Sequence, residues 1–114
     1  MGDCIFCRIV EKQIPSKIVY EDDSILAFHD IDAKAPVHIL IIPKEHIPSI
    51  NDVKPQNCDV IARIFSVIPQ IVENLGVKNS GYRVVANSGS DAGQSVNHLH
   101  FHVLGGRTLS WPPG

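Results

Sequence analysis

Three histidines alternate with apolar residues near the end of the chain, in the stretch His98-Leu99-His100-Phe101-His102-Val103-Leu104. Successive side chains on a β-strand point to opposite faces, so the three imidazoles would share one face, about 6.6 Å apart along the strand. The apolar residues between them would face a core. Because imidazole titrates near neutral pH, such a face suits proton transfer, nucleophilic attack or metal binding.

The pattern alone leaves three interpretations open. In the first, one neutral imidazole attacks phosphorus while a neighbour on the same face donates a proton to the leaving group. The loop 87–95, rich in Gly, Ser, Asp and Asn, would then supply backbone N–H groups as an anion cradle. In the second, the histidines bind a metal ion, since two histidines spaced H-x-H on a strand suit zinc and a third histidine or a carboxylate could complete the site; a catalytic metal held by all three histidines is one form of it. In the third, the histidines are structural and satisfied by hydrogen bonds.

The cysteines offer a second candidate site. Cys4 and Cys7 form a C-x2-C pair, whereas Cys58 stands among apolar residues and is predicted to be a small buried side chain. The pair could be redox-active, half of a zinc site, or simply buried. A redox role is disfavoured because no strand precedes the pair, as it would in a thioredoxin-like unit. Zinc needs two further ligands, and His46 is one candidate.

Length and composition place the chain among ordinary globular domains. It has 114 residues, 44% of them hydrophobic and 19% charged, and a formal net charge of -2. These values favour a single domain over residues 1–114 with one core. The absence of a basic excess argues against a nucleic-acid partner, and no apolar run is long enough to span a membrane. With three cysteines and no signal-peptide pattern, we expect a cytoplasmic enzyme or binding protein.

Hydrophobic periodicity predicts the elements that must position these residues. Two segments read as helices and one as a single helical turn: Cys4–Lys12, Gln56–Leu75 and Ser49–Val53. Pro69 lies inside the long helix and predicts a kink within one continuing element. Five segments read as strands: Lys17–Glu21, Ser24–His29, Val37–Pro43, Tyr82–Ala86 and Asn97–Leu104. Their short connections favour antiparallel pairing, so we expect an α+β domain with the long helix on one sheet face.

The histidine strand and its flanks resemble the histidine triad (HIT) family, and other stretches resemble its Hint branch of nucleotide-binding nucleoside phosphoramidases. These stretches are Ile14-Pro15-Ser16-Lys17, Phe28-His29-Asp30-Ile31, Pro36-Val37-His38, Ile42-Pro43-Lys44-Glu45-His46-Ile47, Gly93-Gln94-Ser95-Val96, and Leu104-Gly105-Gly106-Arg107 through Trp111-Pro112-Pro113-Gly114. The resemblance implies a purine nucleoside phosphoramidase that hydrolyses adenosine or guanosine 5′-monophosphoramidates, or related AMP conjugates, and binds AMP or GMP. The alternative is a nucleotide-binding regulatory protein whose catalysis is vestigial.

The resemblance also implies a role for each site residue. His100 would attack the α-phosphorus to form a nucleotidyl-histidine, His102 would assist at the phosphate and in proton transfer, and Ser95 would hydrogen-bond the phosphate or the leaving amine. His38 would sit beside the histidine strand and orient it. The remaining nucleotide contacts would be Asp30 at the ribose, Phe6, Ile9, Ile31 and Leu40 around the purine, and Asn87, Gly93, Gln94 and Ser95 around the phosphate.

A structural zinc ion and a homodimer follow from the same resemblance. Relatives that begin with Cys-Ile-Phe-Cys look like zinc-bound members, with ligands corresponding to Cys4, Cys7, His46 and His98. Such a four-coordinate site is closed and therefore structural. The resemblance implies no organic cofactor. Two copies would join their sheets into one ten-stranded sheet, and the tail with Trp111 would reach toward the partner's site.

Overall fold

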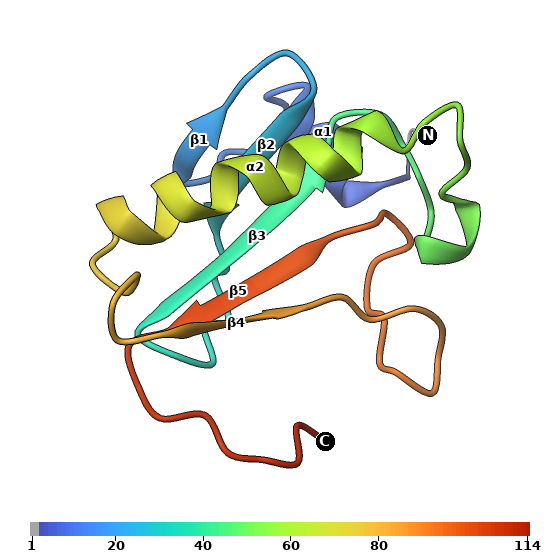
Figure 1. Ribbon diagram of the computed structural model, residues 1–114. Helices are drawn as coiled ribbons and strands as arrows, with labels where there is room; N and C mark the ends of the chain where they lie inside the picture. The colour runs from blue at the N-terminus through green and yellow to red at the C-terminus, as the bar shows by residue number, and fades with distance from the viewer. Residues whose placement is uncertain (1–2) are drawn as a thin grey trace.

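A five-stranded antiparallel sheet with the strand order β1-β2-β3-β5-β4 forms the centre of the molecule (Figure 1). The computed structural model describes residues 3–114. The elements along the chain are α1 (Ile5–Val10), β1 (Ile18–Glu21), β2 (Ile25–His29), β3 (Val37–Pro43), the 3-10 turn η1 (Ile50–Asp52), α2 (Asp59–Asn74), β4 (Tyr82–Val85) and β5 (Phe101–Gly105). The predicted α+β arrangement of five antiparallel strands with one short and one long helix is confirmed.

Apolar residues cover both faces of the sheet because alternate residues of β2 and β3 face opposite sides. One set packs against α2 and includes Ile25, Ala27, Ile39 and Ile41. The other set packs against Phe6 and Ile9 of α1 and includes Leu26, Phe28, Leu40 and Ile42. Burial on both faces explains why β3 reads as an almost unbroken apolar run. It also places α1 beside the centre of the sheet, where the candidate site lies.

The histidine strand is shorter than predicted. It begins at Phe101, not at Asn97, so only His102 of the three histidines lies within β5. The ladder stops there because Ile41 opposite Phe101 is the last β3 residue to pair with β5, and β4 ends opposite His102. Before Phe101 the backbone bonds to a different segment, since the Leu99 N–H donates to the Ile47 carbonyl at 2.6 Å.

The side chains nevertheless alternate between the two sides as predicted, even before Phe101, where the chain does not pair with β3. Leu99, Phe101 and Val103 all join the core beneath α2. His100, by contrast, contacts Phe6 of α1 on the other side, with ring centroids 5.1 Å apart. The period-2 pattern therefore predicted the sides correctly, while the extent of the strand depended on where its neighbours end.

The long helix begins later than predicted, and Cys58 is exposed at its start, which corrects the expectation of a buried cysteine. The buried stripe of α2 begins one turn further on and consists of Ile64, Val67, Ile68, Ile71 and Val72. Cys58 precedes the first turn of α2, so its side chain does not belong to this buried stripe. The helix continues through Pro69 as one element, as expected, and the predicted turn near Ser49 is the 3-10 turn η1. No helix among residues 3–114 is long and apolar enough to cross a membrane.

Candidate metal centre and nucleotide pocket

The three alternating histidines belong to two different clusters. His98 lies with Cys4, Cys7 and His46, and one ligand atom from each of these residues lies within 4.8 Å of all the others. His100 and His102 instead line a cavity between α1 and the sheet. Among residues 3–114, no such cluster contains all three alternating histidines, so the interpretation as a three-histidine catalytic metal site is wrong.

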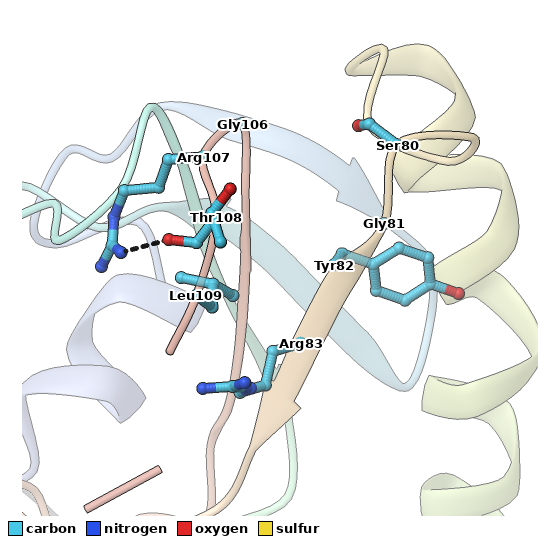
Figure 2. Close-up of a pocket in the computed structure, with 8 residues that line it drawn as sticks. All are labelled: Ser80, Gly81, Tyr82, Arg83, Gly106, Arg107, Thr108 and Leu109. Atoms are coloured by element: carbon cyan, nitrogen blue, oxygen red, sulfur yellow. Dashed lines mark hydrogen bonds between the residues drawn. The ribbon is translucent and has the colours of Figure 1, made fainter. Parts of the chain in front are cut away.

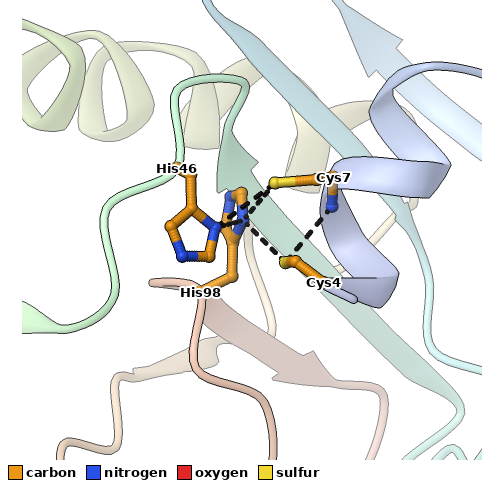
Figure 3. A group of neighbouring side chains, drawn as sticks. All are labelled: Cys4, Cys7, His46 and His98. Atoms are coloured by element: carbon orange, nitrogen blue, oxygen red, sulfur yellow. Dashed lines mark hydrogen bonds between the residues drawn. The ribbon is translucent and has the colours of Figure 1, made fainter. Parts of the chain in front are cut away.

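The Cys4–Cys7–His46–His98 cluster has the dimensions of a tetrahedral metal site (Figure 3). The Nδ1 atoms of His46 and His98 are 3.2 Å apart. The Cys4 Sγ lies 3.4 Å from the His98 Nδ1, and the Cys7 Sγ lies 3.3 Å and 3.6 Å from the His46 and His98 Nδ1 atoms. Ordinary zinc–nitrogen and zinc–sulfur bond lengths give tetrahedron edges of about 3.3 Å for N–N and about 3.6 Å for N–S. The cluster is therefore compatible with bound zinc.

Groups around the cluster determine which of its donor atoms are protonated. The His98 Nε2 lies 2.8 Å from the Pro43 carbonyl oxygen, so this nitrogen carries the proton and the Nδ1 lone pair faces the cluster. Burial, followed by the neighbouring Cys4 thiol, raises the pKa of Cys7 to about 11. Two thiols and two imidazole lone pairs at these distances fit a divalent cation, which would stabilise the thiolates.

The N-terminal helix brings its two cysteines to the cluster together. Cys4 is the N-cap residue of α1, and its Sγ accepts a hydrogen bond from the Cys7 N–H at 3.4 Å. Residues three apart lie on the same side of a helix, so both thiols face His46 and His98. The cluster thus joins the start of α1 to the segment after β3 and the segment before β5.

A second group, formed by Asp30, His38 and His102, has a different proton arrangement. The Lys34 N–H donates to the His38 Nδ1 at 3.0 Å, so the His38 Nε2 carries that ring's proton. This nitrogen lies 2.9 Å from the His102 Nδ1 and 3.3 Å from the Asp30 Oδ2. A metal ion between these groups would have to displace the Nε2 proton of a ring whose Nδ1 already accepts a hydrogen bond. The group is therefore better suited to proton transfer than to metal binding.

These contacts assign a different proton position to each of the two histidines in the cavity. The His100 Nδ1 lies 2.7 Å from the His98 carbonyl oxygen and must donate to it, which leaves a lone pair on the His100 Nε2. The His102 Nδ1 accepts from His38, which leaves the proton of the neutral His102 ring on Nε2. One imidazole is thus arranged as a nucleophile and its neighbour as a proton donor.

Burial keeps the supporting imidazoles uncharged. Burial, together with the nearby imidazoles of His100 and His38, lowers the pKa of His102 to about 4. Burial also lowers the pKa of His38, although the carboxylate of Asp30 acts in the opposite direction. At neutral pH these two rings are therefore neutral, as the hydrogen-bond chain between them requires.

The cavity is lined by apolar side chains together with a few polar ones. It has a volume of about 260 Å³. Of the predicted nucleotide contacts and catalytic residues, it is lined by Phe6, Ile9, Asp30, Ile31, Leu40, Ser95, His100 and His102. A mainly apolar cavity with a few polar groups suits a flat heteroaromatic base that carries a polar substituent. Sequence reasoning had not assigned a role to several further lining residues, namely Ile5, Ile14, Pro15, Ser16, Phe28, His29 and Val96, which come from four separate segments.

Three predicted phosphate contacts do not line this cavity. The Gln94 side chain donates to the Pro48 and Val96 carbonyls at 2.8 Å and 3.0 Å and accepts from the Gly89 N–H at 3.0 Å. Its amide therefore holds the loop 87–95 together. Gly93 forms a turn in that loop with a φ of 79°. Asn87 lines a separate hollow beside the C-terminal tail.

The sequence of the chain is similar to known proteins of one family. The HIT domain model matches residues 11–109. The purine nucleoside phosphoramidase of Escherichia coli K12 is 45% identical over 107 residues, which cover 94% of this chain and 90% of the relative. An uncharacterized HIT-like protein of Synechocystis is 43% identical over 112 residues, which cover 98% of this chain and 97% of that protein.

Solved structures agree with the sequence relatives. The HIT family hydrolase of Legionella pneumophila superimposes with a TM-score of 0.95 at 46% identity and covers 98% of this chain and 100% of its own. A histidine triad protein of Clostridium difficile superimposes with a TM-score of 0.93 at 46% identity and covers 96% of each chain. The likeness therefore extends over the whole sheet and both helices.

Proposed function

This chain belongs to the HIT domain family, and we propose that it is a purine nucleoside phosphoramidase that acts through a nucleotidyl-histidine intermediate. The observation that carries the proposal is the hydrogen bond from His100 to the His98 carbonyl, which leaves the His100 Nε2 unprotonated beside the cavity. The likeness to the Escherichia coli phosphoramidase supplies the substrate class, a nucleoside 5′-monophosphoramidate.

In the first step, the His100 Nε2 forms a bond to the α-phosphorus while the phosphorus–nitrogen bond to the amine breaks. The His102 Nε2–H gives its proton to the departing nitrogen and water replaces that proton, so the amine leaves neutral, the His102 ring stays neutral and a hydroxide ion remains. In the second step, this hydroxide attacks the same phosphorus and the bond to His100 breaks. The products are a nucleoside monophosphate and an amine, and both histidines regain their starting protonation.

The remaining predicted site residues bind the substrate. Phe6, Ile9, Ile31 and Leu40 would hold the purine, and the Asp30 carboxylate would accept hydrogen bonds from the ribose hydroxyls. Ser95, which lines the cavity, would contact the phosphate or the leaving amine. We retain Asn87, Gly93 and Gln94 only as loop residues near the phosphate, since the Gln94 amide is engaged within the loop.

We propose further that Cys4, Cys7, His46 and His98 hold a structural zinc ion. When bound, the ion would supply a cross-link between α1, the segment after β3 and the segment before β5. We also propose a cytoplasmic homodimer joined through β4, which pairs only with β5 within residues 3–114 and so has one sheet edge open. Sedimentation of the purified protein tests the dimer.

Mass spectrometry of the protein quenched during turnover of adenosine 5′-phosphoramidate tests the proposed reaction. The expected result is an adenylyl group on His100, absent from a His100→Ala variant. Tight AMP binding without adduct or turnover would instead support the alternative of a nucleotide-binding regulatory protein.

A further inference from the structure

Arg107 connects the start of the C-terminal tail to the loop that precedes β3. Its Nε and Nη2 donate to the Lys34 carbonyl oxygen at 3.1 Å and 2.9 Å. Its Nη1 donates to the Thr108 carbonyl at 3.0 Å, a contact that Figure 2 shows beside Arg83 and Tyr82. The guanidinium thus uses three of its donors on backbone carbonyls, and two of them hold one residue of the loop 30–36.

The backbone before Arg107 is shaped to make this contact. Gly106 has a φ of 90°, a conformation that favours glycine, and a Cβ there would lie 2.9 Å from the Pro36 Cβ. The chain therefore turns tightly against the loop 30–36 as it leaves β5. This close approach brings the Arg107 side chain alongside Lys34, 73 residues earlier in the sequence.

Lys34 acts on the Nδ1 side of His38, opposite the Asp30 carboxylate 3.3 Å from the Nε2 atom, and helps to determine the proton position on this ring. Its N–H donates to the His38 Nδ1 at 3.0 Å, which leaves the proton of that ring on Nε2, facing the His102 Nδ1 at 2.9 Å. A continuous chain of hydrogen bonds therefore runs from Arg107 through both sides of Lys34 to His38 and His102. Arg107 is exposed and does not line the cavity, so it acts only through this chain.

We propose that Arg107 is a positioning residue that determines which nitrogen of His102 carries the proton. If Lys34 were not held, its N–H would leave His38, and the His38 ring could take its proton on Nδ1. The His38 Nε2 would then accept a hydrogen bond from the His102 Nδ1, and the His102 Nε2 would have no proton to donate. The consequence for catalysis rests on the proposed function, whereas the proton position itself does not.

Three variants separate this role from simple stabilisation. Arg107→Met keeps the aliphatic stem and removes every donor, and Arg107→Lys restores one charged donor. Arg63→Met is the matched control, because the Arg63 guanidinium also makes two hydrogen bonds, at 2.9 Å each, to Asp22 and Tyr20 outside the site. Urea unfolding of each variant establishes that it is folded.

The first measurement is the imidazole tautomer, read from ¹⁵N chemical shifts of the full-length protein at pH 7.5. In the unmodified protein and in Arg63→Met, we expect the Nε2–H form at His38 and His102 and the Nδ1–H form at His100. In Arg107→Met we expect Nδ1–H forms at His38 and His102, with a smaller population of these forms in Arg107→Lys. Unchanged tautomers in Arg107→Met would overturn the proposal, even if the protein hydrolyses no phosphoramidate.

The second measurement compares two substrates of Arg107→Met. On adenosine 5′-phosphoramidate, whose amine must be protonated, kcat should fall roughly tenfold or more with KM little changed. On adenosine 5′-(4-nitrophenyl phosphate), whose phenolate leaves without a proton, kcat should change less than about twofold. An equal loss on both substrates, or no loss on either, would contradict a role in proton donation. Failure of the unmodified protein to act on either substrate would count against the proposed function alone.

Discussion

The Nδ1 atom of His100 lies 2.7 Å from the carbonyl oxygen of His98, and the ring of that same His98 belongs to the cysteine-containing cluster. One residue therefore contacts the proposed nucleophile through its backbone and the proposed metal centre through its side chain. Phe6 reinforces the connection, because its ring contacts both His98 and His100, with centroids 5.9 Å and 5.1 Å away. The proposed metal centre and the proposed nucleotide pocket therefore share residues and form one structural unit.

Replacing the nucleophile should separate chemistry from binding. In His100→Ala we expect the turnover of adenosine 5′-phosphoramidate to fall by roughly a thousandfold or more, because the Nε2 atoms of His38 and His102 carry protons and cannot replace the nucleophile. AMP affinity, measured by calorimetry, should change little because the purine slot remains. Turnover close to that of the unmodified protein would exclude His100 as the nucleophile.

Removing a cysteine of the cluster should remove the metal. Cys7→Ser is expected to lower the zinc content from about one ion per chain to near zero and to lower the melting temperature, since a closed zinc site contributes to folding. Cys58→Ser is the matched control, because Cys58 is an exposed thiol outside the cluster. Elemental analysis and thermal unfolding measure both effects. Equal zinc content in the two variants would show that the cluster does not bind the metal.

The AMP affinity of Cys7→Ser should also fall, because α1 carries Phe6 and Ile9 into the pocket. Titration of AMP into the metal-free variant and into Cys58→Ser measures this effect. Equal affinities would mean that α1 keeps its place without the metal.

Acid should destabilise the fold partly through His102. Burial lowers the pKa of this residue to about 4, whereas an unfolded histidine has a pKa near 6.5. Between pH 6.5 and pH 4 this histidine is protonated in the unfolded state and neutral in the folded state. The free energy of unfolding must therefore decrease as the pH falls through this range. Urea unfolding at a series of pH values should show a smaller decrease in His102→Asn. The metal ligands titrate in both proteins, so an identical pH dependence would refute the assignment to His102.

The carboxylate of Asp22 should contribute far more to the free energy of unfolding than that of Asp32. Asp22 accepts hydrogen bonds from the N–H groups of Ser24 and Ile25 and from Arg63 and Tyr20. Although burial would raise it, the pKa of Asp22 is held well below its usual range by these donors. Asp22→Ala should therefore lower the free energy of unfolding by about 2 kcal/mol, as measured in urea.

Asp32→Ala serves as the comparison for Asp22, because Asp32 forms an exposed ion pair with Lys34 at 2.9 Å. Exposed pairs of this kind contribute little, so no measurable change in stability is expected. If both substitutions had the same effect, the Asp22 network would not join the β1–β2 turn to α2 as its geometry indicates.

Local patterns were sufficient for most of the secondary structure and for part of the site. The alternation from Leu99 to Val103 predicted which side chains enter the core, because the pleat of an extended chain has a period of two whatever its partners. β3 was predicted with its observed bounds, Val37–Pro43, since a buried β-branched run leaves few alternatives. The resemblance to a known family supplied the cavity residues from Phe6 to His102 that periodicity could not bring together.

The alternation itself does not distinguish the three histidines, and the tertiary structure shows how their surroundings differ. Their spacing is symmetrical, but His98 lies beside Cys4, 94 residues earlier, and only the folded chain brings the two together. Proton positions depend on backbone partners, which are the Pro43 carbonyl for His98, the His98 carbonyl for His100, and the Lys34 N–H, acting through His38, for His102. Such partners are absent from the sequence pattern because backbone groups are the same at every residue. The sequence thus determined that three imidazoles alternate with core residues, and the fold determined that one joins Cys4, Cys7 and His46 while the other two line the cavity with their protons on different nitrogens.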